Sequence, residues 1–199
     1  MDTLEAIMTR RSTRKYTTRA VEEALLHKVV EAGRYAPSGG NHQFNHFLVM
    51  RDKAAIQHLA HLAKEAFAKM EIADNTYVSL KTAILRSQKG DYDFSYHAPV
   101  LILVANQKTY ANNLADAAVA VENMMVAANA LDLGSCWINQ IKWLTVDTED
   151  QPVLSYLYTL GLKEQERVYA SMILGYPDTP NALPERTALA RKGNEVSYL

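Results

Sequence analysis

Residues 99–138, PVLILVANQKTYANNLADAAVAVENMMVAANALDLGSCWI, decide the fold of this chain. The opening PVLILV, at 99–104, predicts a strand that is buried on both faces, because a short apolar run without alternation has no side left for water. A long helix is predicted next, over about 112–132, and its apolar residues lie nearly all round, so we expect it to be buried on most sides. Gly134 lies just past the predicted helix end, near the place of a C-cap glycine, and residues 136–138 form a short strand candidate.

Outside this stretch the chain alternates helical patterns with few apolar runs. Helices are predicted over about 2–8, 22–33, 52–70, 76–88 and 149–160, and further strands over 47–50 and 169–174. Pro37 disfavours helix at Ala36, which ends the second helix, and the tail from 178 to 199 shows little periodicity. Few strands among many helices, with long connections, indicate an α+β domain whose sheet is covered by helices. No composition shift marks a boundary, so residues 1–199 are interpreted as a single domain.

The composition excludes several classes of protein. The chain has 21 basic and 22 acidic side chains and a formal net charge of -1, so no bulk field attracts nucleic acid or an anionic membrane. One cysteine, Cys136, excludes a disulfide framework. No apolar stretch approaches the roughly 20 residues that span a bilayer, and no basic segment followed by an apolar run opens the chain. We therefore expect a soluble, cytoplasmic protein without a signal peptide.

The first candidate site is the basic run at residues 10–14, RRSTR, directly after the first helix. Arginine binds phosphate through two parallel hydrogen bonds, and hydroxyl and backbone N–H groups can complete such a cradle. Charge runs are also common as solvated turns, and that alternative stays open. An arm for nucleic acid is disfavoured, because the run is short and has no interleaved aromatic residues.

The second candidate is the loop APSGGNHQ at residues 36–43. Two glycines allow the backbone to approach a flat ligand closely, while Ser38, Asn41 and Gln43 offer donors and acceptors to a polar ring edge. The same residues would also make an ordinary connection between a helix and a strand. The loop is neither a P-loop nor a dinucleotide fingerprint, because it has no Gly-Lys-Ser/Thr and no G-x-G-x-x-G.

Three further segments are ambiguous when each is taken alone. Residues 134–140, GSCWINQ, follow the most apolar helix and could be a core strand with its turn. Residues 174–177, LGYP, read as the stop of a strand, and Arg191 with Lys192 reads as a basic surface pair.

In this order and spacing the segments resemble one family, the FMN-dependent nitroreductases. RRSTR is similar to the family's opening motif, and APSGGNHQ is similar to its second motif. Residues 116–125 resemble its central helix, while GSCWI and LGYP match the next two signatures. The resemblance covers nearly the whole chain. It implies a mainly antiparallel sheet flanked by helices, in an intertwined homodimer.

The resemblance also implies roles for individual residues. Arg10, Arg11 and Ser12 would hold the FMN phosphate and ribityl chain, and Arg191 and Lys192 would return to the phosphate. Arg14 would reach the N1/O2 edge of the flavin ring. The segment Ile138, Asn139 and Gln140 would lie near N5 and O4. The residues that would come from the other subunit to cover the ring are Pro37, Ser38, Gly39 and Asn41.

The implied activity is an oxidoreductase in which NAD(P)H reduces FMN and the flavin then reduces a nitroaromatic, a quinone or a similar small acceptor. The flavin N5 would carry the hydride, so no catalytic side chain is assigned. Other activities of the family remain alternatives: dehalogenation, flavin fragmentation and the reduction of other small molecules. A flavin-binding protein without turnover is a further alternative from a different class.

One departure from the family pattern stands out. The family usually continues its second motif with Gln-Pro-Trp, whereas this chain has Gln43-Phe44-Asn45. The segment from about 70 to 96 varies widely in the family, so neither Lys81 nor Arg86 is assigned to the flavin, and the aromatic residues at 92, 94 and 96 could either stack on a ligand or pack in a lid.

Cysteine and histidine chemistry is set aside. Cys136 lies in an apolar run without an obvious base, as an inert packed thiol does. The histidines at 42 and 46, and those at 58 and 61, have spacings that could bind metal, but no carboxylate or cysteine set completes either pair.

Overall fold

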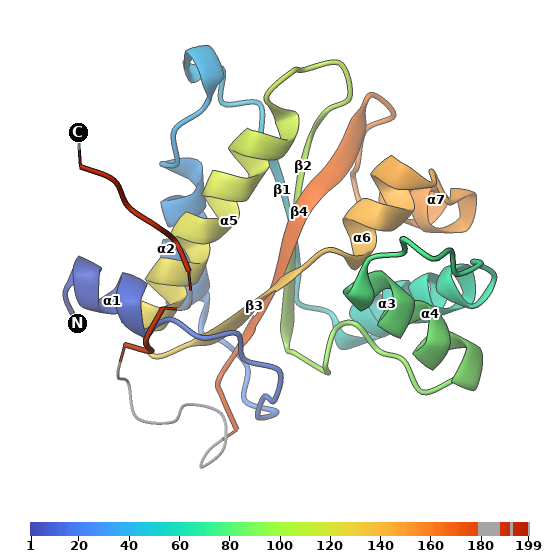
Figure 1. Ribbon diagram of the computed structural model, residues 1–199, viewed down its shortest axis with the longest axis horizontal. Helices are drawn as coiled ribbons and strands as arrows, with labels where there is room; N and C mark the ends of the chain where they lie inside the picture. The colour runs from blue at the N-terminus through green and yellow to red at the C-terminus, as the bar shows by residue number, and fades with distance from the viewer. Residues whose placement is uncertain (179–187, 192, 199) are drawn as a thin grey trace.

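The computed structural model describes residues 1–178, 188–191 and 193–198 (Figure 1). Its α-helices are α1 (Thr3–Thr9), α2 (Glu23–Arg34), α3 (Lys53–Ala68), α4 (Val78–Lys89), α5 (Asn113–Ala130), α6 (Gln140–Lys142) and α7 (Gln151–Thr159). A 3-10 turn, η1 (Gly39–Asn41), and a π-helical turn, η2 (Trp143–Asp147), complete the helical elements. The strands are β1 (His46–Met50), β2 (Val100–Gln107), β3 (Gly134–Ile138) and β4 (Glu166–Gly175).

These strands form one sheet in the order β1-β2-β4-β3, and every neighbouring pair is antiparallel. The two central strands, β2 and β4, are longer than the apolar patterns predicted and are buried almost throughout. The predicted α+β class with an antiparallel sheet is therefore confirmed. The long connections between the strands carry the helices, which is why few strands lie among many helices in the sequence.

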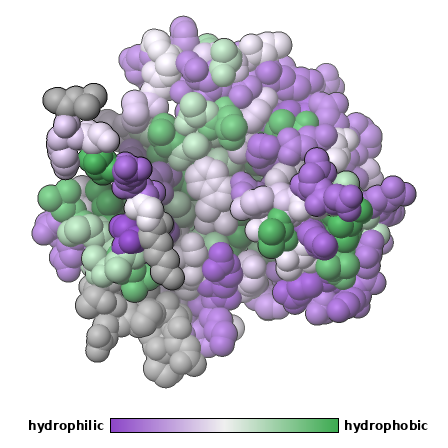
Figure 2. Space-filling view, viewed as in Figure 1, coloured by the Kyte–Doolittle hydropathy of each residue, from purple (hydrophilic) through white to green (hydrophobic). Residues whose placement is uncertain are grey.

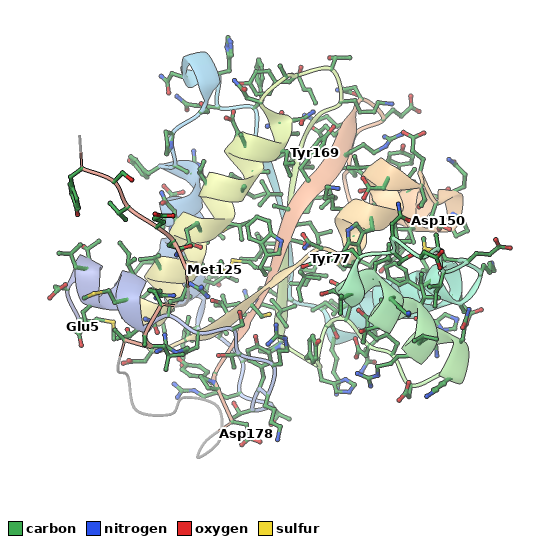
Figure 3. The ribbon with its side chains drawn as sticks, in the orientation of Figure 1. Glu5, Tyr77, Met125, Asp150, Tyr169 and Asp178 are labelled. Atoms are coloured by element: carbon green, nitrogen blue, oxygen red, sulfur yellow. The ribbon has the colours of Figure 1, made fainter. Side chains whose placement is uncertain are left out.

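The sheet has helices on both faces, which explains the uninterrupted apolar run of β2. Leu101 and Leu103 point to the face covered by α3, α4 and α7. Ile102 and Val104 point to the opposite face, where α2 and α5 lie. Among the residues that Figure 3 labels, Met125 on α5 belongs to one side and Tyr77 at the start of α4 to the other. A strand with a core on either side has no polar face, so it reads as continuous rather than alternating.

Helix α1 begins after Asp2, whose carboxylate accepts a hydrogen bond from the backbone N–H of Glu5 at 2.9 Å. Its predicted apolar face exists but points outward: Leu4, Ile7 and Met8 are 69%, 47% and 48% exposed. Figure 2 shows hydrophobic surface on the side of the molecule where Figure 1 draws α1. Apolar residues gathered on one surface of a chain often mark a contact with another chain.

One local expectation was wrong, and two short helical turns were not foreseen. Gly134 does not cap α5 but opens β3, because Asp132 takes the left-handed conformation, with φ 61°, that turns the chain. Gly134 is instead needed for a close approach, since a Cβ there would lie 2.8 Å from the Thr13 side chain. The turns of α6 and η2, between β3 and α7, are too short to give a periodic pattern and were not predicted.

The sequence of the tail shows little periodicity, and its described residues have no regular secondary structure. Residues 188–191 and 193–198 form no helix or strand, and residues 179–187, 192 and 199 lie outside the described set. Within the described ranges, no helix combines the length and the apolarity that crossing a bilayer requires.

One carboxylate at the start of β4 links this strand to β1, which lies beyond β2 in the sheet. Glu166 is 4% exposed, and its Oε2 lies 2.8 Å from His46 Nδ1 on β1 and accepts the backbone N–H of Lys163 at 3.1 Å. Burial by itself acts to raise the pKa of Glu166, but these hydrogen bonds outweigh it and lower the pKa below the ordinary glutamate value. The ionised form is therefore the one that stabilises the fold.

We expect Glu166→Gln to lower the free energy of unfolding at pH 7 by about 1.5–3 kcal/mol, as the loss of charge-assisted hydrogen bonds does. A lowered pKa stabilises the fold above the unfolded value of about 4.3 and ceases to do so as the pH falls through the folded value. The variant should accordingly lose less stability than the parent between pH 5 and acid conditions. Urea unfolding across that pH range measures both effects. The exposed neighbour Glu164→Gln is the matched control, and equal behaviour of the two variants would contradict the assignment.

Candidate functional site

The basic segment at residues 10–14 runs along the edge of the sheet beside β3. The backbone N–H of Thr13 donates to the carbonyl of Ser135 at 2.8 Å, and Ser12 forms a parallel bridge with Ser135. Thr13 is buried against Gly134, whereas Ser12 and Arg14 are exposed. The structure thus joins the first and third candidate segments, which lie some 120 residues apart in the sequence.

The fourth segment holds the same strand edge from the other direction. After Gly175 the chain pairs with residues 15–17: Thr17 N–H donates to the carbonyl of Tyr176 at 2.9 Å, and Tyr16 bridges to Pro177. Gly175 is required here, because a Cβ would lie 2.6 Å from Pro99 and 2.9 Å from Tyr16. The LGYP signature therefore has a structural role: it anchors the segment that carries the arginines.

In the described part of the chain, Arg10 and Arg14 have no carboxylate partner closer than 3.8 Å. Arg10 Nε lies 3.8 Å from Glu122 Oε1 on α5, and the Arg14 guanidinium lies 6.0 Å from the centre of the Tyr96 ring. Arg11 donates to the backbone carbonyls of Met8 and Arg10. At these distances Arg10 and Arg14 keep most of their field for an anion from solution.

Cys136 is buried beneath this basic segment, close enough for the charges of Arg14 and Arg10 to act on its thiol. Burial raises the pKa of the Cys136 thiol, while the nearby charges of Arg14 and Arg10 and a hydrogen bond with Ser12 act in the opposite direction without cancelling the effect. The thiol is 1% exposed and stays protonated at neutral pH. A neutral, covered thiol is a poor nucleophile, which agrees with the expectation that Cys136 is packing.

Both ends of β3 carry polar atoms that the described part of the chain leaves unsatisfied. Ile138 uses its carbonyl to accept from Ser171 Oγ at 2.7 Å, and Asn139 Oδ1 accepts from Trp137 Nε1 at 2.6 Å. Among the described residues, however, Thr13 Oγ1, Ser135 Oγ and Gln140 Oε1 are buried without any hydrogen-bond partner. Buried polar atoms are normally paired, so the orphan hydroxyls of Thr13 and Ser135 in the basic segment and its partner strand, and the orphan Gln140 oxygen past the other end of β3, suit a bound polar ligand.

The structure also separates the aromatic residues at 92–96, which the sequence could not. Phe94 is completely buried in the core. Tyr92 Oη accepts from Gln140 Nε2 at 2.6 Å, and burial raises the pKa of Tyr92 to about 12. Tyr96 is half-buried beside Arg14. Tyr92 was therefore missed as a partner of the β3 end, since no spacing in the sequence connects it to Gln140.

The loop at residues 37–41 lies elsewhere, at the N-terminal end of α5 (Figure 1). Its Gly39 N–H donates to Asp116 Oδ1 at 3.1 Å, in the first turn of α5. Beside it opens a cavity of about 610 Å³, lined among others by Pro37, Ser38, Asn41 and Gln43. This loop, like the basic segment, combines accessible polar atoms with backbone that a ligand can approach.

Within a single chain, the basic segment at residues 10–14 and the loop at 37–41 lie far apart. Asn129, in the last turn of α5, donates to the carbonyl of Ala6 at 2.9 Å and thereby fixes the helix that precedes residues 10–14. Asp116 and Asn129 are thirteen positions apart, which at 1.5 Å per residue is about 20 Å. The basic segment and the loop at 37–41 are thus held at opposite ends of α5.

The structure adds little on the remaining positions that the sequence singled out, which are the basic pair in the tail and the histidines. Arg191 is exposed, and Lys192 lies outside the described residues. The histidines that could have bound metal have other contacts: His42 stacks on Phe44 and His58 meets the Tyr156 ring edge. In the part of the chain that the structure describes, no group of three or more His, Cys, Asp or Glu side chains could hold a metal ion.

Known proteins resemble this chain both in sequence and in structure. Residues 7–176 match the profile of the Nitroreductase family. A protein of Archaeoglobus fulgidus, provisionally named NADH dehydrogenase/NAD(P)H nitroreductase, is 28% identical over 175 residues, which cover 87% of this chain and 84% of that protein.

Two solved structures share the fold over essentially the whole chain. A nitroreductase with bound FMN from Bacteroides fragilis is 33% identical, with a TM-score of 0.86 over 100% of this chain and 99% of its own. A nitroreductase with bound FMN from Desulfitobacterium hafniense is 22% identical and superimposes with a TM-score of 0.81 over the same shares, 100% and 99%. The fold, the order of the motifs and the profile agree, and the chain belongs to the Nitroreductase family.

Proposed function

We propose that this protein is an FMN-dependent oxidoreductase that transfers hydride from NAD(P)H to a nitroaromatic, a quinone or a similar small acceptor in a ping-pong reaction. The observation that carries the proposal is the pairing of the basic segment with the start of β3, where Thr13 Oγ1 and Ser135 Oγ are buried without a hydrogen-bond partner among the described residues. This pairing lies in a chain that is 33% identical, end to end, to a nitroreductase with bound FMN.

The residues fit FMN by their chemistry. A terminal phosphate takes several converging arginines and hydroxyls, which the basic segment provides. The residues for the phosphate and ribityl chain are Arg10, Arg11 and Ser12, with Arg191 and Lys192 from the tail. Arg14 would reach the N1/O2 edge of the ring, and Ile138, Asn139 and Gln140 would lie near N5 and O4. The dinucleotide FAD is disfavoured, because the chain has no second phosphate fingerprint.

When bound, FMN supplies a ring that accepts and releases hydride, so the protein needs to bind, orient and tune it rather than supply a nucleophile. Arg14 remains a cation at any physiological pH and stabilises negative charge on the pyrimidine side. Tyr92 holds the Gln140 amide through the hydrogen bond at 2.6 Å and so fixes which atom of that amide faces the ligand.

The proposed enzyme is a homodimer with two equivalent sites. Pro37, Ser38, Gly39 and Asn41 of one chain would cover the flavin held by the arginines of the other, since one chain keeps these segments about 20 Å apart along α5. The outward apolar face of α1 and the exposed residues Leu189, Val196 and Tyr198 of the tail offer the surface for a partner.

We expect Cys136→Ser to leave flavin reduction within a few-fold of the parent, because the buried thiol stays protonated and no step uses it. Iodoacetamide should label Cys136 slowly in the native protein and rapidly after unfolding in urea, with mass spectrometry as the measurement. A variant that binds FMN normally but cannot be reduced by NAD(P)H would show that the thiol takes part in the reaction.

We expect the purified protein to be yellow, with FMN rather than FAD released on denaturation. Arg14→Ala should retain FMN through its phosphate but slow its reduction about ten- to a hundred-fold, as the loss of a charge-assisted bond of about 1.5–3 kcal/mol predicts. Arg10→Ala should instead weaken FMN retention first. Stopped-flow bleaching of the flavin by NADH and by NADPH, at saturating FMN, separates the two effects.

Two outcomes would contradict these assignments. A colourless protein that cannot be reconstituted with FMN would remove the proposed function altogether. An unchanged bleaching rate in Arg14→Ala would leave the function standing but remove the role given to Arg14.

We expect light scattering to give the mass of two chains at micromolar concentration, with one FMN per chain. Ile7→Asp, which places a charge in the exposed apolar face of α1, should weaken the dimer and release FMN together. Leu85→Asp on α4 is the matched control, because Leu85 is similarly exposed, 42% against 47% for Ile7, on the opposite side of the sheet. A stable monomer with bound flavin would overturn the shared site.

A further inference from the structure

A line of hydrogen bonds connects the buried end of β2 to the start of α5. Asn106 is 0% exposed, and its Nδ2 donates to Asn45 Oδ1 at 2.9 Å. Asn45 Nδ2 in turn donates to the backbone carbonyl of Asp116 at 2.9 Å. Asn106 is itself oriented by its own strand, since its Oδ1 accepts the backbone N–H of Gln107 at 2.7 Å. Each side-chain amide in this line is therefore fixed at both its donor and its acceptor.

The line ends on Gly39, in the middle of the loop at residues 37–41. Gly39 N–H donates to Asp116 Oδ1 at 3.1 Å, and Tyr110 Oη donates to the Gly39 carbonyl at 2.9 Å. Both backbone groups of one residue are thus held by side chains from the start of α5 and the turn before it. A Cβ there would lie 2.2 Å from Asn112 Nδ2 and 2.6 Å from Tyr110 Oη, so a larger residue would displace these two side chains.

The loop needs such support, because its backbone is unfavourable by itself. Asn41 and Gln43 have φ values of 53° and 54°, in the left-handed region that side chains other than glycine seldom adopt. Such residues persist only where the surroundings determine them, and they gather at ligand sites. Here the surroundings are Asp116 and Tyr110 on Gly39, together with Ser38 Oγ, which accepts the Gln43 N–H at 3.0 Å.

Asp116 is a costly residue for a merely structural task. It is 4% exposed, and its second oxygen, Oδ2, is buried without a hydrogen-bond partner among the described residues. A buried carboxylate with an unpaired oxygen destabilises a fold, and an apolar residue would pack at lower cost. Asn45 occupies one of the positions where this sequence departs from the Gln-Pro-Trp that is usual in its family.

We propose that Asp116, Tyr110 and Asn45 are positioning residues that hold the loop at 37–41 in the shape that receives FMN. This inference rests on the proposed function, in which Pro37, Ser38, Gly39 and Asn41 cover the flavin. The loop is ready before the flavin arrives, so binding does not have to order it, and affinity is gained by that preorganisation.

The test compares FMN affinity with stability in single variants. The apoprotein is prepared by removing FMN, and the Kd of FMN is measured by quenching of flavin fluorescence. We expect Asp116→Ala, Tyr110→Phe and Asn45→Ala each to raise this Kd, by about ten- to a hundred-fold for Asp116→Ala as loss of a hydrogen bond to a charged group implies. Asp116→Asn keeps an oxygen for the Gly39 N–H and should restore affinity to within a few-fold.

The matched control is Asn123→Ala, on the same helix. Asn123 Nδ2 donates to the carbonyl of Ala32 at 3.1 Å, so this variant also loses one bond from an α5 side chain to backbone, away from the loop. We expect it to lower the Tm about as much as Tyr110→Phe while leaving the Kd of FMN unchanged. If the Kd rises in proportion to the loss of Tm in all variants, Asn123→Ala included, the bonds are only structural and the inference is wrong.

A second readout does not involve flavin. Amide hydrogen exchange of residues 38–43 in the apoprotein should quicken in Asp116→Ala and Tyr110→Phe, and not in Asn123→Ala. Should Asp116→Ala fail to fold, Tyr110→Phe, which removes one oxygen atom, decides the question. A parent protein that does not bind FMN overturns the proposed function, whereas a parent that binds it and variants that bind it equally well overturn this inference alone.

Discussion

The burial of α5 against the sheet is the constraint on which the whole candidate site depends. The helix packs on β2, β4 and β3, and α1 and α2 pack on it in turn. An apolar helix of this kind has little freedom to rotate or shift, since its side chains fill a dense core. Each end of α5 then offers one polar side chain: Asp116 fixes the loop at 37–41, and Asn129 fixes the helix before the arginines. The rigidity of the core is transmitted to two surface segments.

Burying those two polar side chains makes the docking of the surface segments specific. Asn129, 3% exposed, donates to the Ala6 carbonyl and to Thr9 Oγ1, and Asp116 accepts from Gly39. A buried polar group without its partner costs more than the pair gains, so any other placement of α1 or of the loop is penalised. Apolar contacts alone would hold both segments nearby, but they would not select one register. A cofactor site needs that selection, because small displacements of its ligands weaken binding.

The sequence predicted the parts of this arrangement that depend on local patterns. The apolar run of β2 and the all-round apolar pattern of α5 predicted both elements, and the helix expected over about 52–70 corresponds to α3. Gly134 was misread, because Asp132 can also adopt a left-handed conformation and no pattern indicates which residue will do so. The resemblance to a family indicated residues 10–14 and 37–41 as binding segments, and their pairing with β3 and with α5 emerged only from the fold. The line from Asn106 through Asn45 to Asp116 could not be predicted, since three polar residues on separate elements meet only after the sheet has formed.

The same fold explains how a nearly neutral chain can bind an anion. With 21 basic and 22 acidic side chains, the overall field is weak, so the charge must be arranged locally. Pairing of residues 10–14 with the edge strand β3 fixes the backbone from which Arg10 and Arg14 project. Within the described ranges, the carboxylate near Arg10 is that of Glu122, which lies 3.8 Å away and is half-exposed, so that water screens the pair. Beside Arg14 lies an aromatic ring rather than a carboxylate. A guanidinium in a short, buried ion pair would have to break that bond to bind phosphate, whereas the long, solvent-screened pair of Arg10 and the aromatic contact of Arg14 cost little to give up.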